Sequence, residues 1–191
     1  MDIVIIGDGK VGHKLAMQLS GENYNVTLID QCEKKLSDTV NEMDVSCVAG
    51  DGGSAEVQRK ADVPGADLVI ACTSTDEMNL FCCLLARRLG AKQTIARVRN
   101  PVYAEQMHLL KEDLKLSMAV NPELALAGEI SRVLIFPSAA NIETFVKGRV
   151  ELVEVTLNEK SVIAGVPLSG LYKKYQIKML ICAVQRRQKV Y

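Results

Sequence analysis

The most constraining feature of this chain is a G-x-G-x-x-G pattern whose surroundings fit one supersecondary unit. The pattern, Gly7–Gly12, follows the apolar run Ile3–Ile6 and precedes a helical pattern. A second apolar run, Val26–Ile29, is followed by Asp30, about twenty residues beyond the glycines. An apolar run, a glycine loop, a helical pattern and then an acid predict a βαβ unit with a glycine-rich turn. The alternative is a glycine-rich turn in an unrelated α/β domain.

Each part of this pattern has a physical role in binding a nucleotide. Gly7 permits the tight turn, Gly9 lets a pyrophosphate approach the backbone, and Gly12 lets the helix pack against the sheet. The helix then presents free N–H groups and the positive end of its dipole to the phosphate. The residues expected to bind in this loop are Gly7, Asp8, Gly9, Lys10, Val11 and Gly12.

Asp30 indicates which nucleotide the loop takes. Its carboxylate would accept hydrogen bonds from the two ribose hydroxyls and would repel a 2′-phosphate. NAD or NADH is therefore favoured over NADP. ATP, ADP and AMP stay open as alternatives, because they carry the same ribose.

Strand-like runs and helical patterns alternate through the first ~120 residues, which is typical of a parallel sheet covered on both faces. We expect a Rossmann-like, doubly wound α/β fold with six parallel strands and a ligand crevice above the carboxyl ends of the first and fourth. The predicted strands are Asp2–Ile6, Asn25–Ile29, Ser46–Ala49, Leu68–Cys72, Thr94–Val98 and Ser117–Val120.

Polar loops follow three of these strands and would border the same crevice. From them we predict that Asp51, Gly52, Thr73, Ser74 and Arg97 take part in binding. For three other polar residues a structural role is favoured. Ser54 and Thr75 suit helix N-caps, and Glu77 suits a first helical turn.

Composition narrows the class of protein. The chain has 191 residues, 48% of them hydrophobic, and its formal net charge is zero, so no nucleic-acid partner is indicated. The six cysteines form no C-x-x-C pair, and we expect reduced thiols and no metal site. His13 and His108 stand alone in the sequence and are expected on helix surfaces. We expect no signal peptide and no membrane insertion, since no apolar segment reaches about 18 residues.

The alternation stops at Asn121, which divides the chain into three predicted parts. Residues 1–121 form the nucleotide-binding domain, 122–149 a helix with a linker, and 150–191 part of a small α+β domain. The helix carries a broad apolar stripe with no predicted strand to cover it, so a second subunit or the next subdomain would do so, and Pro137 would end it. Strands are expected at Val150–Leu157 and at 177–184, with a turn at Ile163–Pro167.

Together these residues resemble the RCK (regulator of potassium conductance) family, to which the peripheral subunits of Trk-type potassium uptake systems belong. The resemblance covers essentially the whole chain. Beyond the glycine loop, Asp30 and Gly50–Gly52, it rests on Thr73–Asn79, Ala96–Tyr103, Asn121–Glu123, Phe136–Ser138 and Lys147–Leu152.

The resemblance implies a cytosolic regulatory subunit, peripheral to the inner face of the cell membrane, that binds NAD(H) or an adenine nucleotide and gates a separate membrane pore. It places Asp30 on the ribose, Asp51 near the adenine, and Thr73 and Arg97 near the distal part of the ligand. It also implies a crossover helix that pairs subunits in dimers and rings. In Ktr-type relatives the position of Glu123 can help bind a divalent cation. Trk subunits usually hold two such units, so one unit indicates a fragment.

Two other functions are considered. An NAD-dependent oxidoreductase would need a proton-transfer group and a substrate domain, yet the sequence shows no Tyr-x-x-x-Lys and no histidine in a crevice loop. We therefore expect no enzymatic activity. A scaffold without a ligand would have no use for Asp30.

Overall fold

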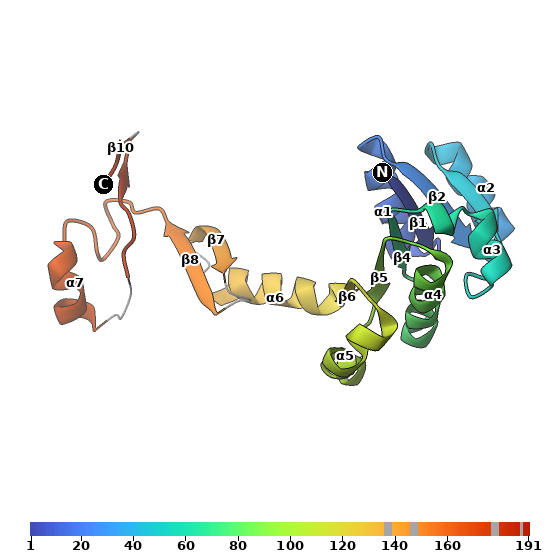
Figure 1. The fold of residues 1–191 in the computed structure, drawn as a ribbon. Coiled ribbons are helices and arrows are strands. Elements are labelled where there is room, and N and C mark those ends of the chain that lie inside the picture. Colours follow the sequence, from blue (N-terminus) through green and yellow to red (C-terminus); the bar gives the residue numbers. More distant parts are fainter. Residues whose placement is uncertain (136–138, 146–148, 177–179, 188) are drawn as a thin grey trace. The chain divides into compact units, whose positions relative to one another are not determined.

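Six parallel strands form the central sheet of this protein, which is described by a computed structural model. The structure describes residues 1–135, 139–145, 149–176, 180–187 and 189–191, without the side chains of 110–112 and 172–173. The chain forms two compact units, Met1–Glu129 and Ile130–Tyr191 (Figure 1). Each unit is described by itself below.

The sheet of the first unit has the doubly wound order β3-β2-β1-β4-β5-β6, with every pair parallel. The order reverses between β1 and β4, so the carboxyl ends of these two strands lie side by side. The predicted α/β fold class is therefore confirmed. The strands are β1 Asp2–Ile6, β2 Asn25–Asp30, β3 Ser46–Ala49, β4 Leu68–Ala71, β5 Gln93–Arg97 and β6 Met118–Val120.

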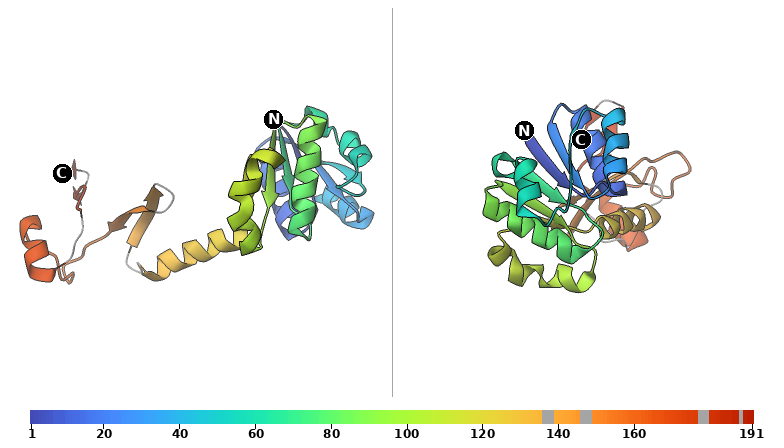
Figure 2. Two further views of the ribbon diagram at one scale, coloured as in Figure 1. Left: turned by 60° about the horizontal axis from the view of Figure 1, so that its bottom comes forward. Right: turned by 90° about the vertical axis from the view of Figure 1, so that its right-hand side faces the viewer.

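Helices cover both faces of this sheet, as Figure 1 and Figure 2 show. Along β1, Ile3 and Ile5 enter the core on the α1 and α2 side, whereas Val4 and Ile6 enter the core on the α4 side. A strand buried on both faces reads as a continuous apolar run, which is why this segment could be recognised. The helices are α1 Lys10–Gly21, α2 Glu33–Glu42, α3 Ala55–Lys60, α4 Asp76–Leu89 and α5 Pro101–Leu114, with a short 3₁₀ turn at Val63–Gly65.

The second unit differs from the prediction in several elements. The strand expected at 177–184 is wrong where it can be judged, since residues 180–184 form no strand, and 177–179 lie outside the described residues. Strand β8 ends two residues early, and β7, α7, β9 and β10 were not predicted. The elements are β7 Ala139–Phe145, β8 Val150–Val155, α7 Leu168–Tyr175, β9 Gln185–Arg186 and β10 Lys189–Val190.

Strand β7 escaped prediction for a physical reason. It pairs with β8 in an antiparallel hairpin whose register shifts between Ala139 and Asn141. A bulge breaks the alternation of apolar and polar residues on which recognition of a half-buried strand depends.

Helix α6, Pro122–Ile135, contributes to both units and has no buried residue. Its end at Pro137 lies outside the described residues. Its apolar side chains are more than half exposed, as the stripe in the sequence indicated, and they are Leu124, Leu126, Ile130, Val133, Leu134 and Ile135.

Candidate functional site

The glycine loop between β1 and α1 is a turn that side chains would disrupt at two positions. Gly7 has a backbone φ of +105°, and a β-carbon there would lie 2.9 Å from the carbonyl oxygen of Cys72. A β-carbon on Gly12 would lie 1.9 Å from the carbonyl oxygen of Gly7. At Gly9 a β-carbon would meet none of the described atoms within 4 Å, so the loop is open there.

The first turn of α1 has free hydrogen-bonding capacity. Gly9 is the N-cap, so no side chain caps the helix, and none of the first-turn residues is acidic. Lys10 and Val11 are the first two residues of the helix. Uncapped N–H groups at the positive end of a helix dipole favour an anion.

Asp30, the last residue of β2, lies against this loop. Its Oδ2 accepts a hydrogen bond from the backbone N–H of Asp8 at 2.8 Å, and its Oδ1 accepts one from the N–H of Cys32 at 2.9 Å. Each carboxylate oxygen can accept a further bond, because an ionised carboxylate offers about four lone-pair sites. The acid is therefore held in place with capacity left for ribose hydroxyls.

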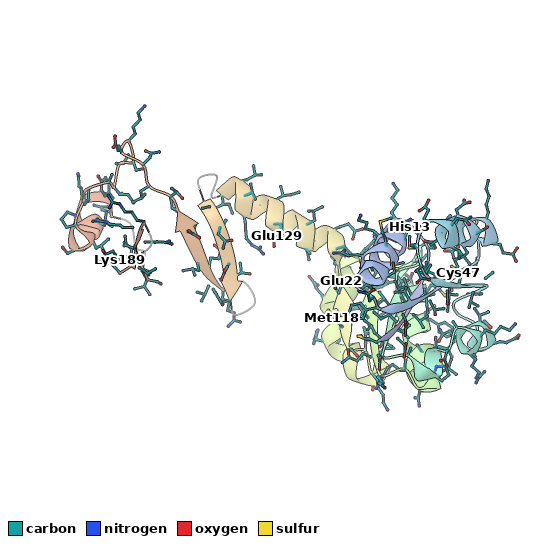
Figure 3. All side chains as sticks on the ribbon, turned by 90° about the horizontal axis from the view of Figure 1, so that it is seen from above. His13, Glu22, Cys47, Met118, Glu129 and Lys189 are labelled. Atoms are coloured by element: carbon teal, nitrogen blue, oxygen red, sulfur yellow. The ribbon has the colours of Figure 1, made fainter. Side chains whose placement is uncertain are left out.

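The side chain of Asp8, a residue expected to bind in the glycine loop, lies inside the protein. Only 5% of the residue is exposed, and its Oδ2 accepts a hydrogen bond of 2.7 Å from the hydroxyl of Thr39 on α2. Its Oδ1 lies 3.1 Å from Nδ1 of His13, whose Nε2 lies 3.2 Å from a carboxylate oxygen of Glu42. His13, labelled in Figure 3, lies on α1 with 32% of its side chain exposed, as expected of a helix surface, but its ring lies between two carboxylates that the sequence does not place beside it. These contacts fix the loop against α2.

The loop after β3 is held by its own side chains and by a buried amide. Asp51 accepts a hydrogen bond of 2.8 Å from the N–H of Gly53, and a β-carbon on Gly52 would lie 2.2 Å from Ile6. Gln58 on α3 is fully buried and donates to the carbonyl of Gly52 at 2.7 Å. Ser54 is an N-cap by position but makes no side-chain bond there.

A buried asparagine, which the sequence analysis missed, joins the loops after β4 and β5. Oδ1 of Asn79 accepts hydrogen bonds from the N–H of Thr73 at 2.6 Å and from its hydroxyl at 2.7 Å. Nδ2 of Asn79 donates to the carbonyl of Arg97 at 2.9 Å. Thr75, as predicted, caps α4 by accepting a bond from the N–H of Met78.

Asp76, in the first turn of α4, holds the loop after β5 in place. Only 5% exposed, it accepts hydrogen bonds from the N–H groups of Arg99 at 2.8 Å and Asn100 at 2.7 Å. The Arg99 guanidinium donates to the carbonyl of Ser74 at 2.5 Å. Ser74 thus contributes its carbonyl to this network. An acid in the first turn of a helix is usually explained by its interaction with the helix dipole. The sequence therefore gave no reason to expect that Asp76 would bind the backbone of the loop after β5.

Arg97, the last residue of β5, connects the carboxyl edge of the sheet to α6. Its guanidinium, with 17% of the side chain exposed, forms an ion pair with Glu123 in the first turn of α6. Slight burial raises the pKa of Glu123, but the Glu123 N–H, the hydrogen bond from Arg97 and the charges of Arg97 and Arg99 outweigh it and lower the pKa. Nε of Arg97 is buried and has no acceptor among the described residues.

Cys72, the residue after β4, lies level with Arg97, because Ala71 pairs with Ala96. Burial raises the pKa of its thiol to about 11, with opposing effects from the positive charge of Arg97 and the negative charges of Asp8 and Asp30. The thiol also contacts the carbonyl of Gly7 at 3.6 Å. Asp8 and Asp30, after β1 and at the end of β2, and Arg97, at the end of β5, thus lie on opposite sides of the point where the strand order reverses.

Other kinds of site are not found in the described part of the chain. No group of three or more His, Cys, Asp or Glu residues could hold a metal ion there. All six cysteines are free, three of them buried. A shallow groove of about 280 Å³ between α2 and β3 is lined by none of the residues predicted to bind. No helix within the described residues is long and apolar enough to cross a membrane.

Sequence comparison identifies the family. Residues 3–122 match the family model of the TrkA-N domain. The chain belongs to the TrkA-N domain family. The Trk system potassium uptake protein TrkA homolog of Archaeoglobus fulgidus is 37% identical over 172 residues, which cover 90% of this chain and 39% of that relative. The resemblance inferred from the motifs is thus confirmed, and the chain spans about two fifths of that relative's length.

Solved structures share the fold. The TrkA-N domain of inner membrane protein ybaL from Escherichia coli matches with a TM-score of 0.62 at 18% identity, covering 70% of this chain and 96% of that one. The GsuK channel bound to NAD matches with a TM-score of 0.59 at 20% identity, covering 76% and 25%. The GsuK structure bound to ADP gives 0.53 at 22% identity, covering 63% and 31%.

Proposed function

We propose that this chain is the nucleotide-sensing part of a regulatory subunit that controls potassium uptake through a separate membrane pore. The observation that carries the proposal is the position of Asp30. Its carboxylate is held by the N–H of Asp8 beside an open glycine loop and an uncapped helix start. That arrangement suits a ribose and a phosphate bound together.

The ligand proposed is NAD(H), with ATP or ADP as the alternative. Asp30 disfavours a 2′-phosphate, since two anions would meet at one point. Thr73 and Arg97 lie across the point where the strand order reverses, where the distal part of a dinucleotide would extend. Asp51, on the loop after β3, is proposed near the adenine. GsuK, which shares this fold, was solved with NAD and with ADP.

The partners proposed are a second copy of this chain and a membrane-embedded potassium transporter. Helix α6 presents apolar side chains from Leu124 to Ile135 that are mostly exposed, and a self-complementary helix pair would cover them. The names of the Trk relatives support the transporter. The proposed location is the cytoplasm, peripheral to the inner face of the cell membrane.

We infer that the nucleotide is a signal rather than a reactant. A hydride-transfer enzyme needs a proton donor beside the nicotinamide. In this chain both ring nitrogens of His13 face carboxylates, those of Asp8 and Glu42, beneath the loop. This contact favours a structural role for the histidine over a catalytic one.

Calorimetric titration with NAD⁺, NADH, ATP and ADP tests the proposal, followed by light scattering in each ligand state. We expect at least one of the four to bind, and the nucleotide to be recovered unchanged after incubation with the protein. If none of the four nucleotides binds, the proposal is overturned, and a scaffold protein that keeps the fold without a ligand becomes the favoured alternative. Oxidation or reduction of the nicotinamide with a hydroxy or keto compound would favour the oxidoreductase.

A further inference from the structure

The ion pair between Arg97 and Glu123 joins the candidate nucleotide site to helix α6. Arg97 ends strand β5 at the carboxyl edge of the sheet, and Glu123 lies in the first turn of the helix. Asn79 fixes the backbone of Arg97 to the Thr73 loop, so the start of this side chain has a defined position. Its guanidinium is the part of the residue that makes the ion pair with Glu123.

Arg97 also lies close to the glycine loop, because Ala96 pairs with Ala71 and Arg97 is therefore level with Cys72. Its charge acts on the thiol of Cys72, which contacts the carbonyl of Gly7. Its Nε is buried without an acceptor among the described residues, and guanidinium groups bind phosphates through several donors at once. A phosphate bound near the loop would therefore find an arginine whose hydrogen-bonding capacity is only partly used.

Helix α6 has a second attachment that does not involve Arg97's side chain. Oδ1 of Asn121 caps the helix by accepting a bond of 2.9 Å from the N–H of Leu124, and its Nδ2 donates to the carbonyl of Arg99 at 2.9 Å. Loss of the pair with Glu123 would therefore loosen the first turn without detaching the helix.

We propose that the phosphates of the nucleotide and the carboxylate of Glu123 compete for Arg97, so that nucleotide binding releases the first turn of α6. This inference rests on the proposed function, because it assumes a nucleotide at the glycine loop. Two anions that share one cation repel each other and weaken each other's binding. By linkage, whatever frees Arg97 from Glu123 strengthens nucleotide binding to the same degree.

Calorimetric titration of two variants in metal-free buffer tests the competition. We expect Glu123→Gln to raise nucleotide affinity about two- to tenfold, a modest gain because Glu123 is exposed. Arg97→Gln should lower the affinity about tenfold or more, as loss of a charged hydrogen bond does. In the double variant the gain from Glu123→Gln should disappear. Glu105→Gln, which removes an exposed acid from α5, is the matched control and should leave the affinity unchanged.

Hydrogen exchange of the amides at 124–128 gives a second readout. In the wild-type chain nucleotide should speed their exchange, whereas in Glu123→Gln exchange should be fast with and without nucleotide. Unchanged or weaker nucleotide binding by Glu123→Gln would overturn the competition. If the wild-type chain binds none of the four nucleotides, the proposed function itself fails, and the two failures are thereby distinguished.

Discussion

The two units of this chain bury apolar side chains to very different degrees. In the first unit, Ile5, Leu28 and Ile29 are fully buried between helices on both faces of the sheet. In the second, Leu171 is the buried apolar residue among those described, and Leu180 is 87% exposed. A sheet between two helical layers closes a core, whereas a two-stranded hairpin has no further layer to pack on. We therefore expect the first unit, which also contains the candidate site, to contribute most of the free energy of unfolding.

The largest expected effect tests whether the glycine loop is part of that core. Gly12→Val should destabilise the first unit by about 4 kcal/mol or more, because the side chain would overlap the Gly7 carbonyl. Denaturant unfolding measures it. Gly9→Ala is the matched control. It should change stability by less than about 0.5 kcal/mol, since the site is open, but reduce nucleotide affinity. Wild-type stability of Gly12→Val would contradict the account.

A matched pair of leucines compares the two units directly. Leu28→Ala, at a fully buried position, should lower the free energy of unfolding by about 2–5 kcal/mol. Leu180→Ala, at an 87% exposed position, should change it by less than about 0.5 kcal/mol. Urea denaturation measures the free energy of unfolding of both variants. A similar loss of free energy in the two variants would mean that the second unit has a core of its own.

Alkaline pH should weaken the first unit through Cys72. Burial holds the pKa of this thiol at about 11 against an ordinary 9.0, so the folded chain keeps the proton to higher pH than the unfolded chain. The stabilisation is complete below pH 9 and is lost as pH rises through 11. It amounts to about 2–3 kcal/mol, since one pKa unit is worth about 1.4 kcal/mol.

Urea melts between pH 8 and 11 measure this loss, and variants assign it. Cys72→Ala should lessen the fall in stability without abolishing it, because burial also raises the pKa of the Cys82 and Cys83 thiols to about 12. Cys32→Ala, at an exposed cysteine, should keep the wild-type fall. An unchanged slope in Cys72→Ala would show that other groups cause the loss.

A smaller effect is expected where α2 supports the glycine loop. Thr39→Val removes the hydroxyl that donates to buried Asp8 and should cost about 1–3 kcal/mol. Thr144→Val on β7 of the second unit is the control, and at an exposed strand position it should cost less than about 0.5 kcal/mol. If the two variants lose the same free energy of unfolding in denaturant, Thr39 does not support the loop.

The sequence was most informative where local pattern and tertiary position coincide. The parallel strands are continuous apolar runs because both of their faces are buried. The alternation of these runs with helical patterns therefore predicted a parallel sheet. The loops predicted to bind could be placed at one edge of the sheet, because the carboxyl ends of parallel strands share one edge. The tight backbone contacts at Gly7 and Gly12 could be predicted from spacing alone, whereas the binding role of Asp30 stays a prediction.

The rest depends on contacts that no spacing encodes. Asn79 binds Arg97 and Asp8 binds Thr39 across long sequence separations, so their partners appear only after folding. His13 looked isolated for the same reason. In the second unit, the register shift in β7 interrupts the alternation of apolar and polar residues. The strand also has no buried residue, so no regular apolar pattern marks it in the sequence.

Calorimetric titration of the wild-type chain and Asp30→Asn with NAD⁺, NADH, ATP and ADP tests the central claim most directly. The account predicts that at least one of these nucleotides binds, and that Asp30→Asn weakens it about tenfold or more, since charged hydrogen bonds to the ribose are lost. Equal binding by the two proteins would contradict a nucleotide site at Asp30, and binding by neither would contradict a nucleotide sensor altogether.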